Sequence, residues 1–352
     1  MPGIETAGDI EPRQAWRSDA WVHEQVASLA GPIAGDVTAS LEMAPQVNYL
    51  ATHLGSSSWQ TFSGLATLGC VDLSTARIME PHIDATAILA QSGADLSGID
   101  ELTARSVWGV FAANGPGHHL VAEESASGWS LSGSKPWCSL AGRLSHALVT
   151  ASDQGRQRLF AVHLDSTSSV TDESSWKARG LAEVVTGTLH FGNAPAVPIR
   201  EAGWYLERAG FAWGGIGVAA VWFGGAAAVA GRLIEAARTR EPDQVALMSI
   251  GICDRALTAG LESLMRAAAM IDRGGATGHQ GALLAARVRS CIAHSVDEVL
   301  RTVGHALGPG PLAFDERHAR RVADLTLYVR QHHAERDLAR VGQLYMMTDE
   351  AP

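Results

Sequence analysis

The apolar residues of this chain repeat with helical spacing near both ends and with strand spacing only in the middle. Residues 16–104 have mostly helical periodicity, whereas residues 107–200 form short alternating runs separated by turn residues. From residue 203 onward the spacing is helical again. The pattern therefore predicts a small β domain between two helical regions.

We expect an α+β protein with an N-terminal α-helical domain at residues 1–106, a central β domain (barrel or sandwich) at 107–202 and a C-terminal four-helix bundle at 203–352. A chain of 352 residues exceeds the usual size of a single core, so packed subdomains are expected. Strands are predicted at 129–131, 147–151, 158–164 and 187–191, and the bundle helices at 215–238, 243–272, 280–307 and 315–346.

Composition and charge restrict the partners of this chain. Hydrophobic residues make up 46% of the sequence and charged residues 18%, which is typical of an ordered globular protein. The net charge of −10 would repel a phosphate backbone, so we expect no nucleic-acid partner. The four cysteines are widely separated, which predicts neither a metal site nor a disulfide framework and fits a cytoplasmic protein.

Two segments bear on targeting and on membranes. Residues 1–13 lack a basic start followed by an apolar core, so we do not expect a signal peptide. Residues 209–231 carry no charge and are about as long as a bilayer-spanning helix. Their many glycines and alanines instead favour a helix packed closely against other protein, and we expect no membrane partner.

The most informative motif is Gly128–Ser139, at the centre of the β-patterned zone. It resembles the flavin-facing strand of the acyl-CoA dehydrogenase superfamily, in which a Gly-x-Lys turn precedes an aromatic residue and a hydroxyl that meet the flavin. Trp137 and Ser139 stand at those two places, on either side of Cys138, and strand alternation predicts that they point to the same side of the sheet. The alternative is a core aromatic beside an ordinary strand serine.

Further segments resemble the same superfamily. The helical segment with Arg77, Glu80 and His82 is similar to part of its N-terminal domain, and the order of the three zones is the family's order. The loop Phe111–His119 stands where the family has a Thr-Glu-Pro loop that binds the flavin and its phosphates. Here alanines replace the hydroxyl residues and His118 replaces a serine. The resemblance implies that Phe111 and the backbone of Gly115 and Gly117 hold the cofactor, although a plain surface turn is the alternative.

The catalytic base of the family is missing from its usual place. Oxidation beside a thioester carbonyl needs a carboxylate to take the α-proton. Most family members carry it in the last helical region, where the equivalent position here falls at or near Arg330. A minority takes the base from the helix after the β domain, and Leu206–Arg208 resembles that setting, so Glu207 is our first candidate base. A solvated glutamate at a helix start is the alternative, and Glu335 is a second candidate.

Two other interpretations stay open. Flavin monooxygenases of this fold lack the glutamate and carry an arginine followed by a histidine, which Arg330 with His332 or His333 resembles. A histidine can donate a proton near neutral pH, so both histidines are candidate catalytic residues. A non-catalytic scaffold of the same fold without flavin is the third interpretation.

The resemblance also implies a cofactor and an assembly. A neighbouring subunit of the family commonly holds the adenine half of FAD with an Arg-x-x-Phe-Gly motif, and the matching place here begins at Arg238 without the Phe-Gly. We therefore expect FAD, with FMN as the alternative, and a small-molecule substrate such as an acyl-CoA or a carrier-protein thioester. Alanine and glycine faces on the bundle favour a homodimer or homotetramer.

Overall fold

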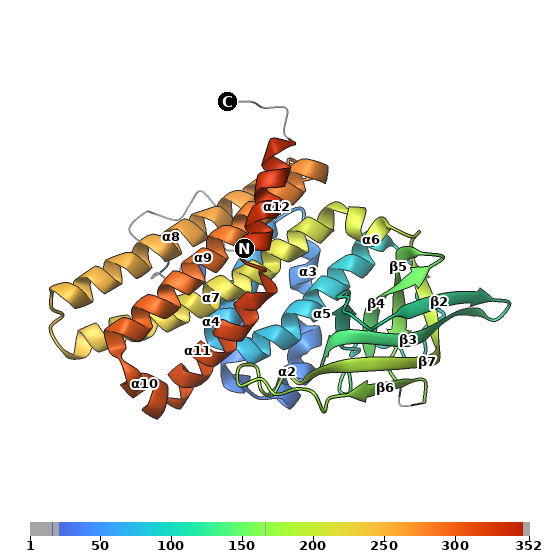
Figure 1. The fold of residues 1–352 in the computed structure, drawn as a ribbon, viewed down its shortest axis with the longest axis horizontal. Helices are drawn as coiled ribbons and strands as arrows, with labels where there is room; N and C mark the ends of the chain where they lie inside the picture. The colour runs from blue at the N-terminus through green and yellow to red at the C-terminus, as the bar shows by residue number, and fades with distance from the viewer. Residues whose placement is uncertain (1–15, 17–20, 166, 348–352) are drawn as a thin grey trace.

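The computed structural model describes residue 16, residues 21–165 and residues 167–347 of the chain. Within this part, seven strands stand between two groups of helices, which confirms the predicted order (Figure 1). The strands lie at one end of the molecule and the longest helices extend away from them. Residues 1–13, the segment tested for a signal peptide, lie outside the described residues.

Among the described residues, five α-helices form the N-terminal group. They are α1 (Glu24–Ala30), α2 (Val37–Met43), α3 (Tyr49–His53), α4 (Ser58–Val71) and α5 (Leu73–Ser92). Helix α5 begins after Asp72, whose carboxylate accepts the backbone N–H of Thr75, and ends at Gly93 in the left-handed conformation. Pro81 lies inside α5 without ending it. One continuous helix thus carries Arg77, Glu80 and Asp84 along the interior of the molecule.

The central domain contains strands β1 (Trp108–Phe111), β2 (Leu120–Ser125), β3 (Gly128–Ser139), β4 (His146–Asp153), β5 (Arg156–His163), β6 (Ser169–Asp172) and β7 (Thr186–Ile199). The sheet runs in the order β1-β4-β2-β3-β7-β5, and an additional β4–β5 pairing closes it into a ring, while β6 pairs with β7. The predicted strands at 129–131, 147–151 and 187–191 lie within β3, β4 and β7, and the one at 158–164 overlaps β5 and extends one residue beyond its end. The closed ring has the barrel arrangement.

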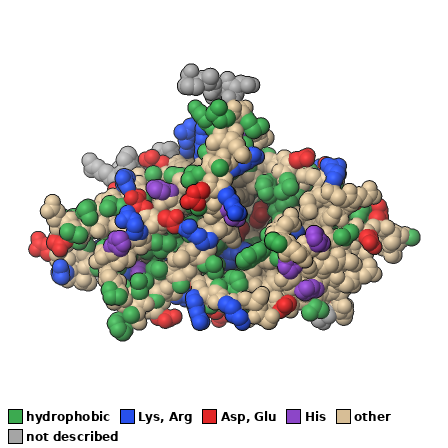
Figure 2. Space-filling view, in the orientation of Figure 1, with side chains coloured by type: hydrophobic (Ala, Val, Ile, Leu, Met, Phe, Trp, Pro, Cys, Tyr) green, Lys and Arg blue, Asp and Glu red, His purple; other side chains and the backbone are tan. Residues whose placement is uncertain are grey.

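The C-terminal group contains α6 (Trp204–Glu207), α7 (Ala209–Thr239), α8 (Gln244–Asp272), α9 (Gly278–Leu307), α10 (Pro309–Phe314), α11 (Glu316–Tyr328) and α12 (Glu335–Met346). Helices α7, α8 and α9 pack against one another, α11 packs on α7, and α12 packs on α9. On the face in Figure 2, acidic and basic side chains are intermixed over these helices.

Helix α7 is the core helix of the molecule. It is long and apolar enough to cross a bilayer, but 78% of its most apolar window is buried inside protein. Glycine allows it to approach α4 closely, because a Cβ atom at Gly224 would collide with the carbonyl oxygen of Ala66 and one at Gly69 with that of Val221. The charge-free segment therefore packs against protein, as its small residues predict.

The last predicted helix, at residues 315–346, is not continuous. Helix α11 ends at Tyr328, a 3₁₀ turn follows at Val329–Gln331, and α12 begins at Glu335. Ala334 has a φ of +48°, which interrupts the helix. The backbone N–H of His333 instead donates to the carboxylate of Asp337, 3.1 Å away. Neither glycine nor proline marks this break in the sequence.

Candidate functional site

The end of β3 presents an aromatic side chain at the surface of the β domain. The Trp137 side chain is 63% exposed, whereas Cys138 is fully buried and Ser139 is half-buried. The register between β3 and β7 shifts between Lys135 and Cys138, and Trp137 has a φ of +64°. This bulge re-aims the indole. Any contact from Cys138 to a ligand beside Trp137 must come from its backbone, because its side chain lies in the core.

A buried lysine fixes the loop beside this strand. The Nζ atom of Lys135 donates to the side-chain oxygen of Asn114 at 3.2 Å, and to the carbonyl and hydroxyl oxygens of Thr150 at 2.8 Å each. Burial lowers the pKa of Lys135 to about 8. Gly133 allows the loop to approach, since a Cβ atom there would collide with the His119 carbonyl. The segment Gly133–Lys135, which is part of β3 rather than a turn, therefore holds the predicted cofactor loop against the sheet.

The predicted cofactor loop offers mainly backbone groups. The Phe111 side chain is buried in the core. Gly117 is exposed with a φ of +79°, and Gly115 lies against Pro136. His118 shares a hydrogen bond with the Ser134 hydroxyl, 3.0 Å from its Nδ1. The structure thus brings this loop to the strand that carries Trp137 and Ser139.

Behind Ser139 lies a polar cluster from three elements. The Ser139 hydroxyl accepts a hydrogen bond from Arg77 Nη2 at 3.2 Å and shares another with the Thr186 hydroxyl at 2.9 Å. Arg77 Nη1 lies 3.4 Å from Glu80 Oε2. The Tyr328 hydroxyl donates to the same carboxylate oxygen at 3.0 Å. We call Arg77, Glu80 and Tyr328 the arginine clamp.

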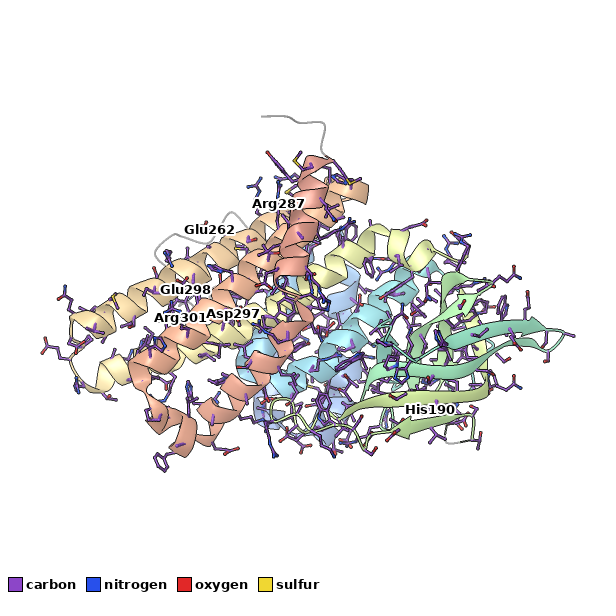
Figure 3. All side chains as sticks on the ribbon, in the orientation of Figure 1. His190, Glu262, Arg287, Asp297, Glu298 and Arg301 are labelled. Carbon is purple, nitrogen blue, oxygen red and sulfur yellow. The ribbon has the colours of Figure 1, made fainter. Side chains whose placement is uncertain are left out.

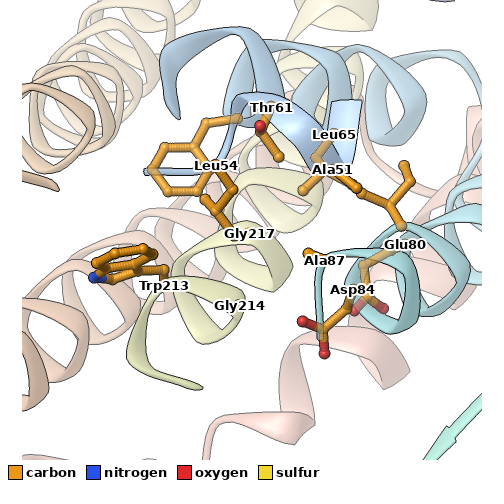
Figure 4. Close-up of a pocket in the computed structure, with 12 residues that line it drawn as sticks. Ala51, Leu54, Thr61, Leu65, Glu80, Asp84, Ala87, Trp213, Gly214 and Gly217 are labelled. Carbon is orange, nitrogen blue, oxygen red and sulfur yellow. The ribbon is translucent and has the colours of Figure 1, made fainter. Parts of the chain in front are cut away.

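A second carboxylate follows Glu80 on the same face of α5. Glu80 and Asp84 line a cavity of about 20 Å³ opposite Trp213, Gly214 and Gly217 of α7 (Figure 4), a volume sufficient for a water molecule. Burial raises the pKa of both carboxyls, and for Glu80 the nearby Asp84 adds to the shift. Asp84 also lies 3.7 Å from Arg208 Nη2. These acids can exchange a proton nearer neutral pH than ordinary carboxyls.

The other predicted catalytic residues have different surroundings. Glu207 is exposed at the end of α6, whereas Arg208 beside it is buried. His332 is buried, with its Nε2 3.1 Å from the Ser290 hydroxyl, and burial lowers its pKa. His333 is exposed and lies 3.5 Å from the Asp337 carboxylate. Both histidines therefore contact α9 or α12 in this structure, rather than β3.

Two predicted arginine positions lie on the helical part of the molecule. Arg330 forms an ion pair with Asp297 on α9, a residue that Figure 3 shows among the charged side chains Glu298 and Arg301. Arg238 is in the last turn of the 31-residue helix α7, roughly 45 Å along its axis from Ala209. Arg238 of the same chain is thus far from the start of α7, which lies beside the β domain.

Sequence reasoning did not assign a role to the arginine clamp or to Asp84. Arg77 and Glu80 entered only as part of a family-like helix. A usable signal was present, because Arg77, Glu80 and Asp84 fall on one face of a helix that is otherwise rich in apolar residues. Charged residues that follow the buried face of a helix indicate a buried polar site.

No family model matches the sequence, and no curated protein matches it either. Solved structures match over almost the whole chain. KijD3 in complex with FMN and a dTDP-amino-keto sugar has 18% identity and a TM-score of 0.76, covering 99% of this chain and 96% of its own. Dibenzothiophene monooxygenase (TdsC) from Paenibacillus sp. A11-2 has 14% identity and a TM-score of 0.74, covering 94% and 96%.

A third match is a glutaryl-CoA dehydrogenase from Mycobacterium smegmatis in complex with FADH2. It has 14% identity and a TM-score of 0.74, and the match covers 95% of this chain and 97% of that one. This chain has the acyl-CoA dehydrogenase fold. The resemblance that the strand Gly128–Ser139 indicated is therefore confirmed at the level of the fold. At these identities the acyl-CoA dehydrogenase fold does not by itself identify the reaction.

Proposed function

We propose that this chain is a flavin-dependent oxidoreductase that oxidises an acyl thioester or a related small substrate. The observation that carries the proposal is the exposed Trp137 side chain beside the half-buried Ser139 hydroxyl, at the end of a strand anchored by Lys135. The solved structures of this fold described above include complexes with FMN and with FADH2. We propose FAD as the cofactor and FMN as the alternative.

The residues at the end of β3 have the kinds of groups that an isoalloxazine ring requires. Such a ring needs an apolar or aromatic wall and hydrogen-bonding groups at its polar edges. Trp137 offers an uncovered indole, Ser139 and Arg77 offer polar atoms, and Gly115 and Gly117 offer backbone groups. A bound flavin would supply the two-electron redox step. The chain's own task would be to orient it and to hold or move the substrate proton.

A monooxygenase on the same fold is the second candidate. TdsC, which matches along nearly the whole chain, is a dibenzothiophene monooxygenase. The sequence resemblance puts the position of the usual dehydrogenase base at or near Arg330, which is not a carboxylate. Glu207 remains the proposed base for dehydrogenation, and His332 and His333 the proposed proton donors for an oxygenase. The substrate under the first proposal is a thioester of CoA or of a carrier protein.

The first test is the absorbance spectrum of the purified protein. Bound flavin gives a band in the blue, and mass spectrometry of the released cofactor distinguishes FAD from FMN. A protein that stays colourless after incubation with either flavin contradicts the proposal and favours the non-catalytic scaffold. If flavin binds, anaerobic addition of a panel of saturated acyl-CoA thioesters should bleach the band in the dehydrogenase. Bleaching that persists unchanged in Glu207→Gln removes Glu207 as the base.

We also propose that the protein assembles with itself and acts in the cytoplasm. Large apolar side chains are exposed on the C-terminal helices, namely Val245, Leu247 and Met248 on α8, Phe314 on α10 and Leu338 and Met346 on α12. Contiguous exposed apolar patches commonly mark contact surfaces, and these side chains are the candidates for one. A homodimer or homotetramer would cover them.

A further inference from the structure

We propose that Arg77 is a positioning residue for the cofactor: the arginine clamp places its guanidinium beside Ser139, where its positive charge stabilises the reduced form of a bound flavin. The inference rests on the proposed function, because it takes the flavin to lie beside Trp137 and Ser139. Reduction by two electrons with uptake of one proton leaves one added negative charge on a flavin. A nearby fixed cation favours that charged form.

The first supporting observation is the direct contact between Arg77 and the site. Arg77 Nη2 donates to the Ser139 hydroxyl at 3.2 Å, and that hydroxyl is held from its other side by Thr186. Arg77 and Ser139 also line a common small cavity with Phe111, the first residue of the predicted cofactor loop. The Arg77 side chain retains 16% of its exposure. The guanidinium therefore belongs to the same surface region as the Ser139 hydroxyl.

The second observation is the rigid support of the guanidinium. Glu80 lies one turn along α5 and holds Arg77 Nη1 at 3.4 Å, while the Arg77 guanidinium carbon lies 5.8 Å from the centre of the Tyr328 ring. The Tyr328 hydroxyl donates to Glu80 and thereby orients the carboxylate. Glu80 and Tyr328 are both buried. A planar guanidinium held by several partners has little freedom to leave its place.

A purely structural role explains this arrangement less well. Buried ion pairs add little net stability compared with apolar side chains of similar volume. An ion pair at i,i+3 on a helix also needs no third partner, yet Arg77 reaches across to β3. The neighbouring charges are Asp84 on α5 and Arg289 on α9, both of which interact electrostatically with Glu80. The stability of the fold does not require the hydrogen bond from Arg77 to Ser139. A role for the positive charge of Arg77 beside Ser139 accounts for it.

The test is the flavin midpoint potential of the reconstituted full-length protein, measured by equilibration with a reference dye during slow reduction with dithionite. We expect Arg77→Met to lower the midpoint potential by about 30 mV or more, which for a two-electron couple corresponds to a tenfold loss in the equilibrium constant for reduction. Arg77→Lys retains the charge and should retain most of the potential. Glu80→Gln removes the neighbouring negative charge but leaves an acceptor for Tyr328, so its potential should rise or stay constant.

Arg255→Met is the matched control, because Arg255 is exposed on α8 and pairs with Glu298 in the helical part. An unchanged potential in Arg77→Met overturns the inference, as does an equal fall in Arg77→Met and Glu80→Gln, which a purely structural role would give. If Arg77→Met does not bind flavin, the midpoint potential of Arg77→Lys is the test. A fall of that potential equivalent to a tenfold loss in the equilibrium constant for reduction overturns the inference. A wild-type protein that binds neither FAD nor FMN is a failure of the proposed function, and it is seen before any variant is made.

Discussion

Two turns of α5 carry three ionisable residues inside packed protein, Glu80, His82 and Asp84. A different contact offsets the free-energy cost of burying each one. Glu80 is held by Arg77 and Tyr328, and Asp84 lies near Arg208. His82 is 1% exposed and accepts the backbone N–H of Trp108 at its Nδ1, 3.1 Å away. A neutral imidazole suits this acceptor role. Burial therefore favours the neutral form of all three ionisable groups on this helix.

His82 makes folding sensitive to acid. Burial lowers its pKa to about 4, below the 6.5 of an unfolded chain. Below pH 6.5 the unfolded chain binds a proton at His82 and the folded protein does not. The contribution of His82 to the free energy of unfolding is therefore complete above about pH 6.5 and is lost as the pH falls to about 4. Between these pH values the free energy of unfolding of the wild type should fall by on the order of 3 kcal/mol because of His82, and His82→Gln should abolish this fall.

The measurement is the free energy of unfolding by urea at several pH values. Glutamine keeps an acceptor for the Trp108 N–H but does not titrate in this range. His190→Gln, on an exposed strand position that Figure 3 labels, controls for a substitution of the same kind. Equal pH dependence in the wild type and His82→Gln would show that another group carries the effect.

At the scale of elements, the contact between α4 and α7 decides how the helical regions join. A side chain at Gly224 would meet the backbone carbonyl of Ala66, which cannot move away as a flexible side chain could. We expect Gly224→Ala to destabilise the protein by roughly 1–3 kcal/mol or more, since overpacking of a close contact costs about this amount. Thermal unfolding followed by circular dichroism measures it.

Gly231 on the same helix provides the matched substitution. In the part of the chain that the structure describes, no atom outside its own helix neighbourhood lies within 4 Å of a Cβ atom built there. Gly231→Ala should therefore raise the stability by up to about 1 kcal/mol, because alanine favours a helix over glycine. Equal effects of the two substitutions would contradict the close-packing argument.

The last helical region shows where local sequence fails. Tyr328 and His332 stand on either side of a break that lacks glycine and proline, and helical spacing alone predicts one helix there. At the break, the carboxylate of Asp337 accepts a hydrogen bond from the backbone N–H of His333, and His332 shares a hydrogen bond with Ser290 of α9. Tyr328 is the last residue of α11, directly before this break, and the packing of α11 against α5 and α7 brings the Tyr328 hydroxyl to Glu80.

At the scale of the whole molecule, we predict a dimer or tetramer. Light scattering on a sizing column should give a mass of two or four chains. Met248→Asp on α8 should lower the fraction of the larger species, because a charge at a buried contact is costly. Val170→Asp, equally exposed but on β6, is the control for a charge outside the helical surface. A wild-type mass of one chain contradicts the proposed assembly.

The sequence by itself determined the order of the three regions, the strand whose motif resembles that of the acyl-CoA dehydrogenase fold, and the small-residue core helix. Those features are local, because periodicity, glycine content and a short motif specify them within a few residues. Only the tertiary structure decided that Arg77, Ser139 and Tyr328 meet, since they come from α5, β3 and α11, which are far apart along the chain. It also decided that Trp137 is exposed while Cys138 is buried, because a register shift against β7 sets the direction of each side chain. Pairing between distant segments has no signature within one window of residues, so the order of elements could be read from the sequence and the clamp could not.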